Sequence, residues 1–377
     1  MRVLIIGAGV AGLTLAARLA QQGRPPVVIE RSADPGAGYA IGLYPMGSCV
    51  LHGLGCYHEL LARGLVVNDY EIADHAGRVL KRVDMSVLTG KVGPLVMIDR
   101  AGLLDILRAA CAGAEIHRGV GVTSLAQDRD GVDVTLDDGR VERADLVVGC
   151  DGIDSVTRRL AGGQEHRHDT GWTLWTWWAA ADLSGAPVFR EWWGQGWFFG
   201  CYPAPGQMMC GCGGPAGQWA SPPADQVSGE LPGQLRTLLR RYPPAGPDSG
   251  EPPATYRWPM RDARAGRWFH RRVALCGDAA VAFLPSAAVG ASAAMRSAAA
   301  LADELSRADA GTVPLALELY QKRCRGIVER AQANSRQLAR VMLVGRPALA
   351  WSRDQLARLY PAHYAVGEII HASHQPF

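Results

Sequence analysis

Several features that would point to a membrane or nucleic-acid partner are missing from the sequence. No apolar run approaches the roughly 18 residues that a membrane-spanning helix needs. Basic residues are not clustered, and the net charge is only +3, from 39 basic and 36 acidic residues. A signal peptide is not indicated either, because glycines interrupt the first apolar run and Arg2 is its only early charge. We therefore expect no membrane span and no nucleic-acid partner.

Cysteine is scarce and shows no pairing pattern. The chain has nine cysteines, an odd number, and they are scattered along its length. Without a secretion signal, such a set favours reduced thiols and a cytoplasmic protein. Cys210-Gly211-Cys212 could be a fragment of a metal or redox site, but no second Cys/His pair stands at ligand spacing. We expect no metal site, and we assign this segment to a strand.

The first thirty residues carry the strongest motif. Residues 2–6 form a short apolar run, which is typical of a strand buried on both faces. The motif Gly7-x-Gly9-x-x-Gly12 follows and opens a helical pattern, and residues 27–29 form a second apolar strand that ends at Glu30. Bare N–H groups at a helix start suit a pyrophosphate, and an acid at this place suits a ribose diol. The alternative is a glycine-rich turn without a ligand.

A cation opens a later helix. Residues 97–99 are followed by a helical pattern that starts at Arg100. A positive charge at a helix start opposes the helix dipole. A ligand anion or a local carboxylate would explain it, and the alternative is a solvated surface arginine.

Two more buried strands each run into a polar turn. Residues 145–150 lead into Asp151-Gly152, with Ser155 and Arg158 behind them. Residues 272–276 lead into Gly277-Asp278-Ala279-Ala280, then Pro285 and Val289-Gly290, before an alanine-rich helix over 291–305. The start of that helix would present N–H groups to an anion, or the helix packs only against its neighbours. A long amphipathic helix is expected over 314–342.

The middle of the chain is rich in tryptophan. Eight of the eleven tryptophans lie between residues 171 and 219. Residues 173–181, 188–193, 197–202 and 207–212 read as strands of one antiparallel sheet, after an earlier hairpin of 66–73 and 79–83. Large aromatics on such a sheet can be core, or they can wall a pocket for a flat apolar substrate. The candidate pocket walls are Tyr44, Trp175, Trp177, Trp192, Phe199 and Tyr202.

Three ordered motifs together resemble the single-component (class A) FAD-dependent monooxygenases, the para-hydroxybenzoate hydroxylase-like family. They are the Gly7 motif with Glu30-Arg31, the Asp151-Gly152 motif and the Gly277-Asp278 motif. The resemblance implies an α/β fold in which a Rossmann-like FAD-binding domain holds an inserted antiparallel-sheet substrate domain and ends in C-terminal helices. The implied FAD-binding parts are 1–72, 97–164 and 261–345, the substrate-domain parts are 73–96 and 165–260, and 346–377 is a tail.

The same resemblance assigns roles to individual residues. Backbone at Val10 and Ala11 would meet the pyrophosphate, Glu30 the ribose, and Arg31 and Val122 the adenine. Arg100 would reach the phosphates or the ribityl chain, Asp278 a ribityl hydroxyl, and Pro285 the reactive edge of the flavin ring. Asp151 and Arg158 would serve both FAD and NAD(P)H. The implied cofactor-binding set is Gly7, Gly9, Val10, Ala11, Gly12, Glu30, Arg31, Arg100, Val122, Asp151, Arg158, Asp278, Pro285, Val289, Gly290 and Ala291.

The activity implied is NADPH- or NADH-dependent hydroxylation or epoxidation of an aromatic or polycyclic small molecule by O2, through a C4a-hydroperoxyflavin, in secondary metabolism. The protein would be a monomer or homodimer. Val281 and Ala294 replace a His and an Asn common in the family. A non-oxygenating flavin reductase or dehydrogenase, or a protein that only binds FAD, therefore stays open. A flavin-dependent halogenase is a further alternative, although Trp175-Thr176-Trp177-Trp178 lacks the Ile-Pro of that family's motif.

Overall fold

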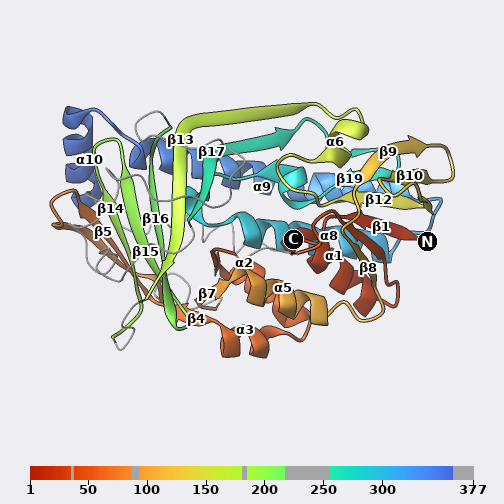
Figure 1. Ribbon diagram of the computed structural model, residues 1–377, viewed down its shortest axis with the longest axis horizontal. Coiled ribbons are helices and arrows are strands. Elements are labelled where there is room, and N and C mark those ends of the chain that lie inside the picture. The colour runs from red at the N-terminus through yellow and green to blue at the C-terminus, as the bar shows by residue number, and fades with distance from the viewer. Residues whose placement is uncertain (35–37, 87–92, 181–184, 217–254, 360–377) are drawn as a thin grey trace.

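The computed structural model describes residues 1–34, 38–86, 93–180, 185–216 and 255–359. The molecule is elongated, with a six-stranded sheet at one end and an eight-stranded sheet at the other (Figure 1). Two long elements run between the ends, strand β13 (Glu165–Ala179) and helix α9 (Val313–Met342). Residues 232–242, which the spacing of Leu235, Leu238 and Leu239 predicts as a helix, lie outside the described residues, as does Trp219.

The six-stranded sheet is the Rossmann-like part of the fold. Its order is β18 (Phe269–His270), β19 (Val273–Leu275), β12 (Leu146–Gly149), β1 (Val3–Ile6), β2 (Val27–Glu30) and β8 (Glu115–Arg118). Strand β1 pairs in parallel with both β12 and β2. All four residues of β1 are buried, as expected for a continuous apolar run covered on both faces.

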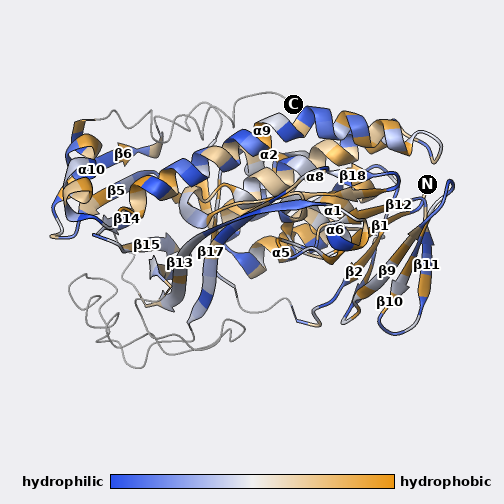
Figure 2. Ribbon diagram, turned by 90° about the horizontal axis from the view of Figure 1, so that it is seen from above, coloured by the Kyte–Doolittle hydropathy of each residue, from blue (hydrophilic) through white to orange (hydrophobic). Residues whose placement is uncertain are grey.

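Helices cover this sheet and fix the positions of its loops. The covering helices are α1 (Val10–Gln21), α5 (Arg100–Ala109) and α8 (Gly290–Ser306). Helix α1 packs against both α5 and α8, with its alanines buried in the contact. Helix α9 alternates hydrophilic and hydrophobic residues along its length (Figure 2), and it buries Leu317, Tyr320 and Cys324 against this core.

Two small sheets lie beside the main one. Strands β9 (Val122–Gln127), β10 (Val132–Leu136) and β11 (Val141–Ala144) form an antiparallel meander. Strand β7 (Leu95–Asp99) pairs with β3 (Ala40–Leu43) and β4 (Leu65–Val67). Strand β3 is followed by the helices α2 (Pro45–Gly53) and α3 (Tyr57–Arg63).

The eight-stranded sheet contains the four strands expected in the tryptophan-rich middle of the chain. Its order is β20 (Val281–Ala282), β17 (Tyr256–Ala265), β13, β16 (Gln207–Pro215), β15 (Phe198–Ala204), β14 (Val188–Trp193), β5 (Asp69–Asp74) and β6 (Val79–Asp84). The run β13-β16-β15-β14 is antiparallel, as expected. The hairpin β5–β6 joins this run through a parallel pairing of β14 with β5, so the whole sheet is mixed.

The tail expected after residue 345 begins with a helix, α10 (Pro347–Leu359). Arg353 anchors α10 to the sheet, because its guanidinium donates to the carbonyls of Trp193, Gly194 and Met342. Asp354 balances its charge. The sequence pattern missed α10 because its outer face keeps Leu349, Trp351 and Leu356 exposed, which obscures the helical periodicity.

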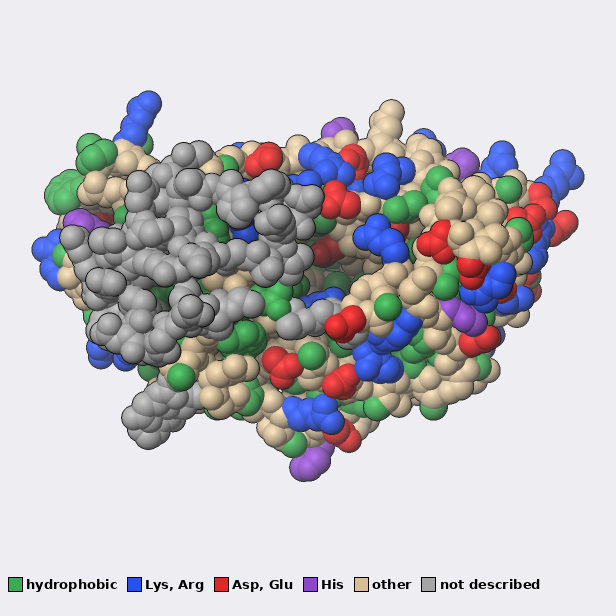
Figure 3. Space-filling view, viewed as in Figure 1, with side chains coloured by type: hydrophobic (Ala, Val, Ile, Leu, Met, Phe, Trp, Pro, Cys, Tyr) green, Lys and Arg blue, Asp and Glu red, His purple; other side chains and the backbone are tan. Residues whose placement is uncertain are grey.

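None of the helices in the described ranges is both long and apolar enough to cross a bilayer. On the face shown in Figure 3, acidic and basic side chains are interspersed over the end that carries the six-stranded sheet. This mixture agrees with the small net charge of +3.

Gln332 on α9 ties two strands of the large sheet together, so we expect Gln332→Leu to destabilise the protein. Its fully buried amide donates to the carbonyls of Ala263 on β17 and Ala282 on β20, at 2.9 and 2.6 Å. Leucine leaves both carbonyls without this donor, which should lower the free energy of unfolding by about 3 kcal/mol in chemical denaturation. Gln337→Leu on the exposed side of the same helix is the control. Equal losses for the two variants would contradict the prediction.

Candidate functional site

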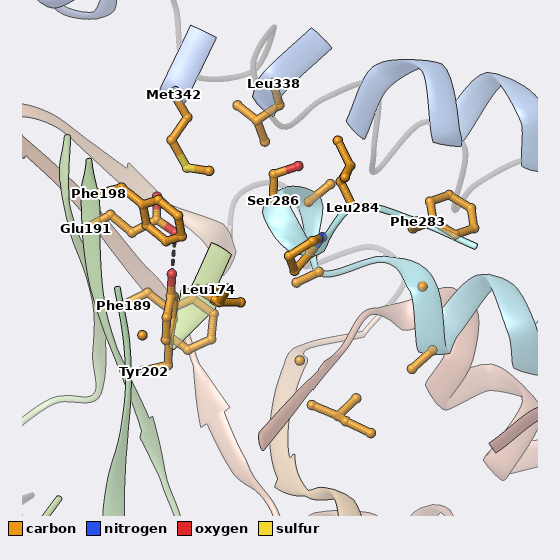
Figure 4. A pocket seen from close by; sticks show the side chains of 18 of the residues that line it. Leu174, Phe189, Glu191, Phe198, Tyr202, Phe283, Leu284, Ser286, Leu338 and Met342 are labelled. Carbon is orange, nitrogen blue, oxygen red and sulfur yellow. Dashed lines mark hydrogen bonds between the residues drawn. The ribbon is translucent and has the colours of Figure 1, made fainter. Parts of the chain in front are cut away.

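One large cavity lies between the two main sheets. Its volume is about 1320 Å³, which exceeds the usual size of a pocket for one small ligand. The Rossmann-like part contributes the loop and first turn of α1, and the large sheet contributes alternate residues of β13, β14 and β15. Figure 4 shows Leu338 and Met342 of α9 on a third side.

The glycine loop after β1 is shaped by close backbone contacts. Gly7 has a φ of +105°, and a Cβ there would lie 2.5 Å from the carbonyl oxygen of Cys150. A Cβ on Gly12 would lie 1.9 Å from the carbonyl oxygen of Gly7. A Cβ on Gly9 would meet nothing within 4 Å, although Gly9 lines the cavity. Two glycines therefore build the loop, and Gly9 keeps its cavity side clear.

Helix α1 directs uncapped N–H groups at this cleared space. The helix begins at Val10 with no side-chain cap and no acidic residue in its first turn. Val10 and Ala11 both line the cavity. Free N–H groups and the positive end of the helix dipole together form a site for an anion such as a pyrophosphate.

Glu30 lies at the end of β2, beside the glycine loop. Its two carboxylate oxygens accept hydrogen bonds from the backbone N–H groups of Ala8 and Ser32, at 2.7 and 2.8 Å. Each oxygen keeps a further lone pair for a ribose hydroxyl. Arg31 and Val122 flank Gly121, whose Cβ would lie 3.7 Å from Cγ of Arg31. The structure thus brings these three predicted residues together at the edge of the sheet, outside the set that lines the cavity.

Arg100 faces the cavity from the start of α5. The local carboxylate is Asp99, which caps α5 by accepting from the N–H of Gly102 at 2.7 Å. Arg100 and Tyr39 line the cavity together with Asp278. Enclosure within the molecule raises the pKa of Asp278 from 3.8 to about 6, although its side chain is open to the cavity. A cation and an acid that titrates near neutrality therefore share this part of the site.

The side chains of Asp151 and Arg158 form hydrogen bonds within the protein, whereas Gly152 of the same motif lines the cavity. Asp151 accepts from Ser155 Oγ at 2.6 Å and from the N–H of Thr157 at 2.9 Å. Arg158 is 1% exposed, donates to the carbonyl oxygen of Ala279 at 2.7 Å and pairs with Glu165. Neither side chain lines the cavity. Asp151 therefore holds the loop after β12 together, and Arg158 joins that loop to the Gly277–Ala279 turn.

The start of α8 forms the opposite wall. Val289 is the N-cap residue and is buried, whereas Gly290, Ala291 and Ala294 line the cavity. Like α1, this helix has no side-chain cap and no acid in its first turn. Pro285 also lines the cavity, at the start of the 3-10 turn Pro285–Ala287. Two helix N-termini therefore face one space, and both are suited to negative charge.

Only two of the six predicted pocket walls line the cavity, Tyr44 and Tyr202. Trp175, Trp177, Trp192 and Phe199 pack together in a separate cluster. Successive residues of a strand point to opposite faces, and the lining residues of the same strands alternate with these four. Both faces of the sheet are apolar, so the pattern showed the alternation without showing which face is the pocket.

The residues missed from the sequence are the neighbours of the predicted ones. The cavity side of β13, β14 and β15 carries Leu174, Thr176, Phe189, Glu191, Trp193 and Phe198. The one available signal was Glu191, an acid within the apolar strand β14. A charged residue among buried aromatics indicates that this face of the sheet has a function that requires a polar group.

The residues around the glycine loop fit a dinucleotide, and two substitutions separate fold from binding. We expect Gly9→Val to leave the unfolding of the flavin-free protein unchanged, because a Cβ there meets no protein atom and Gly9 has an ordinary φ of −80°. FAD affinity should fall about tenfold or more, measured by flavin fluorescence titration.

Gly12→Val is the comparison, because its Cβ would lie 1.9 Å from the carbonyl oxygen of Gly7. This variant should lose about 3 kcal/mol of unfolding free energy even without FAD. Normal FAD binding by the folded Gly9→Val variant would contradict the assignment of the site.

The raised pKa of Asp278 predicts a pH dependence of stability. In the unfolded chain the carboxyl loses its proton near 3.8, and in the native protein near 6. The native state therefore binds more protons between these values, and the free energy of unfolding contributed by Asp278 falls as the pH rises through this window. We expect Asp278→Asn to gain stability relative to the flavin-free wild type from pH 4 to pH 6, followed by denaturation. Asp105→Asn, on the exposed side of α5, is the control. A difference in unfolding free energy between Asp278→Asn and the wild type that stays constant from pH 4 to pH 6 would refute this prediction.

Relatives of the chain match its sequence over most of their length. The 3-amino-4-hydroxybenzoate 2-monooxygenase PtnB3 of Streptomyces platensis is 30% identical over 338 residues, which cover 85% of this chain and 83% of that protein. The aurachin C monooxygenase/isomerase of Stigmatella aurantiaca is 28% identical over 376 residues, covering 95% and 94%.

A solved structure shows the same fold. Klebsiella pneumoniae HpxO, complexed with FAD and uric acid, has a TM-score of 0.86 and 23% identity, covering 99% of this chain and 96% of that one. Residues 1–335 match the family described as FAD binding domain. The chain belongs to this FAD-binding family, and within it to the FAD-dependent monooxygenases.

Proposed function

We propose that this FAD-dependent monooxygenase uses NADPH or NADH and O2 to hydroxylate or epoxidise a flat aromatic or polycyclic small molecule. The observation that supports the proposal is the single cavity, which joins two uncapped helix N-termini to an apolar sheet face. One end suits a phosphate-bearing cofactor and the other a planar apolar ring. Two relatives are named after compounds of this kind, 3-amino-4-hydroxybenzoate and aurachin C.

The cofactor end uses backbone and a few charged side chains. Val10 and Ala11 would bind the pyrophosphate through their N–H groups, and Glu30 the ribose. Arg100 would neutralise phosphate charge, and Asp278 would form a hydrogen bond with a hydroxyl of the ribityl chain. FAD, when bound, supplies the electron transfer and oxygen activation. The N-terminus of α8 would stabilise negative charge on the ring system through its dipole.

The substrate end orients a ring and excludes water. Phe189, Phe198 and Leu174 from the sheet face Phe283 and Leu284, which lie just before α8 (Figure 4). An apolar enclosure of this kind slows the unproductive loss of a reactive oxygen species to water. Ala294 adds no polar group at the start of α8, so substrate binding there depends on shape.

The cysteines support a proposed location. All nine are free in the structure, and seven of them are buried. Free thiols persist in a reducing compartment, which favours the cytoplasm.

Isotope labelling tests the proposed reaction. We expect the purified FAD-loaded protein to oxidise NADPH or NADH faster when a bicyclic aromatic fits the cavity, and to transfer one atom of labelled O2 into the product, read by mass spectrometry. A reductase would instead consume NAD(P)H and return all the oxygen as hydrogen peroxide. That result across an aromatic panel would overturn the proposal and favour the non-oxygenating alternative.

A further inference from the structure

A single acid interrupts the apolar substrate wall. Glu191 lies on β14 between Phe189 and Trp193, on the face that lines the cavity. Its side chain lies beside Phe189 and Phe198 and across from Leu284 and Ser286 (Figure 4). The residue is 9% exposed, and burying a carboxylate among aromatic rings is costly unless the charge is compensated.

Three side chains supply hydrogen bonds to this carboxylate. Tyr70 Oη and Trp193 Nε1 donate to one oxygen, at 2.7 and 2.9 Å. Tyr202 Oη donates to the other oxygen at 2.8 Å, the bond drawn in Figure 4. We call these four residues the Glu191 cluster. All four line the cavity, and they come from three strands, β5, β14 and β15.

The hydrogen-bonding positions that the Glu191 cluster leaves free for a ligand are all acceptors. Both tyrosine hydroxyls have committed their protons to Glu191, so their oxygens can only accept further bonds. The indole N–H of Trp193 is also used and has no lone pair to offer. One carboxylate oxygen accepts two of the three bonds and the other accepts one, which leaves an acceptor position on the second oxygen. The cluster therefore offers acceptors to a ligand and no donors.

The charge of the cluster is not cancelled nearby. Within the described ranges, no Lys or Arg forms an ion pair with Glu191. Arg353 lies over the ring of Trp193, but Asp354 pairs with its guanidinium. Burial and the charge of Glu191 raise the pKa of Tyr70 and Tyr202 well above their ordinary value, so both phenols stay protonated.

Other ionisable groups around the cavity leave this conclusion in place. Tyr44 also lines the cavity. Burial and the charge of Glu191 raise the pKa of its hydroxyl, which therefore keeps its proton and can donate a hydrogen bond to a neighbouring polar atom. Arg100 and Asp278 belong to the cofactor end. Lys81 on β6 lines the same sheet face as Glu191, because Glu191 pairs with Ile72 of β5 and Ile72 pairs with Lys81. The two backbones lie two strands apart, roughly 10 Å, so Lys81 forms no ion pair with Glu191. Arg340 on α9 lines a different wall.

We propose that the Glu191 cluster is the specificity site of the pocket and binds a hydrogen-bond-donating group of the substrate, such as a phenolic hydroxyl, a ring N–H or an amine. Glu191 and Tyr202 would contact this group, and Tyr70 and Trp193 would position the carboxylate. The same site repels a carboxylate, because it offers no donor and carries negative charge. This inference rests on the proposed function, since it assigns the polar group of that reaction's aromatic substrate.

Three bicyclic probes that differ in one group test the inference on the FAD-loaded protein. They are 2-naphthol, which has a donor, 2-methoxynaphthalene, which has none, and 2-naphthoate, which is an anion. We expect 2-naphthol to bind about tenfold or more tightly than either of the others in isothermal titration calorimetry, as for one hydrogen bond to a charged acceptor. Equal or tighter binding of 2-naphthoate, or no binding of 2-naphthol, would overturn the proposal.

Variants then assign the preference to the carboxylate. Glu191→Gln keeps the shape but adds an N–H donor and removes the charge, so the three affinities should converge to within about threefold. Glu71→Gln is the matched control, because Glu71 is on the adjoining strand, pairs with Arg82 and Arg190 and does not line the cavity. It should keep the wild-type preference. An unchanged preference in folded Glu191→Gln would overturn the proposal.

Tyr202→Phe covers the case in which Glu191→Gln fails to fold. It removes one donor and keeps the ring and the carboxylate, so 2-naphthol should still bind more tightly than 2-naphthoate, and a reversed order would overturn the inference. Calorimetry reads binding alone, so its result stands even if no oxygen enters any product. Oxygen transfer without a preference for 2-naphthol would contradict this inference and leave the proposed reaction intact.

Discussion

The rest of the structure depends on the close contact of three backbone segments at one point. A Cβ on Gly7 would lie 2.5 Å from the Cys150 carbonyl oxygen, and one on Gly12 would lie 1.9 Å from the Gly7 carbonyl oxygen. A Cβ on Gly277 would lie 2.6 Å from the Cβ of Ala11. Only glycine permits these approaches, which bring the three sequence motifs together. As a result, α1 and α8 begin at the same cavity, and both helix dipoles point into it.

The two ends of the cavity are specified by different parts of the chain. The proposed cofactor end consists mainly of main-chain N–H groups and glycine, to which the side chains of Val281 and Ala294 contribute no polar group. The substrate end relies on side chains, which can differ between relatives on one fold. The chain accordingly matches the FAD-binding family over residues 1–335 and has an acid, Glu191, in its apolar wall.

The sequence was sufficient to predict the Rossmann-like part, because each motif there has a fixed local context. The strand, glycine loop and helix of 1–30 follow one another without a gap, and backbone chemistry dictates the spacing. The pocket face was predicted less well. Trp175 and Leu174 are adjacent, and both faces of their sheet are apolar. The two-residue alternation of a strand therefore could not show which face lines the pocket and which packs in the core. The partners of Arg158 were missed because Ala279 and Glu165 contact it only through the tertiary fold.

Strand β13 has a mechanical consequence for the whole molecule. It is 15 residues long, which at about 3.3 Å per residue spans roughly 50 Å. Glu165 at its start pairs with Arg158 near the glycine loop, and Leu174 and Thr176 further along form part of the cavity wall. Strand β17 pairs with it on both sides of an irregularity between Asp169 and Thr173. The strand therefore holds the six-stranded and eight-stranded sheets at a fixed separation. Any opening that admits a bulky molecule has to come from elements other than β13 and β17.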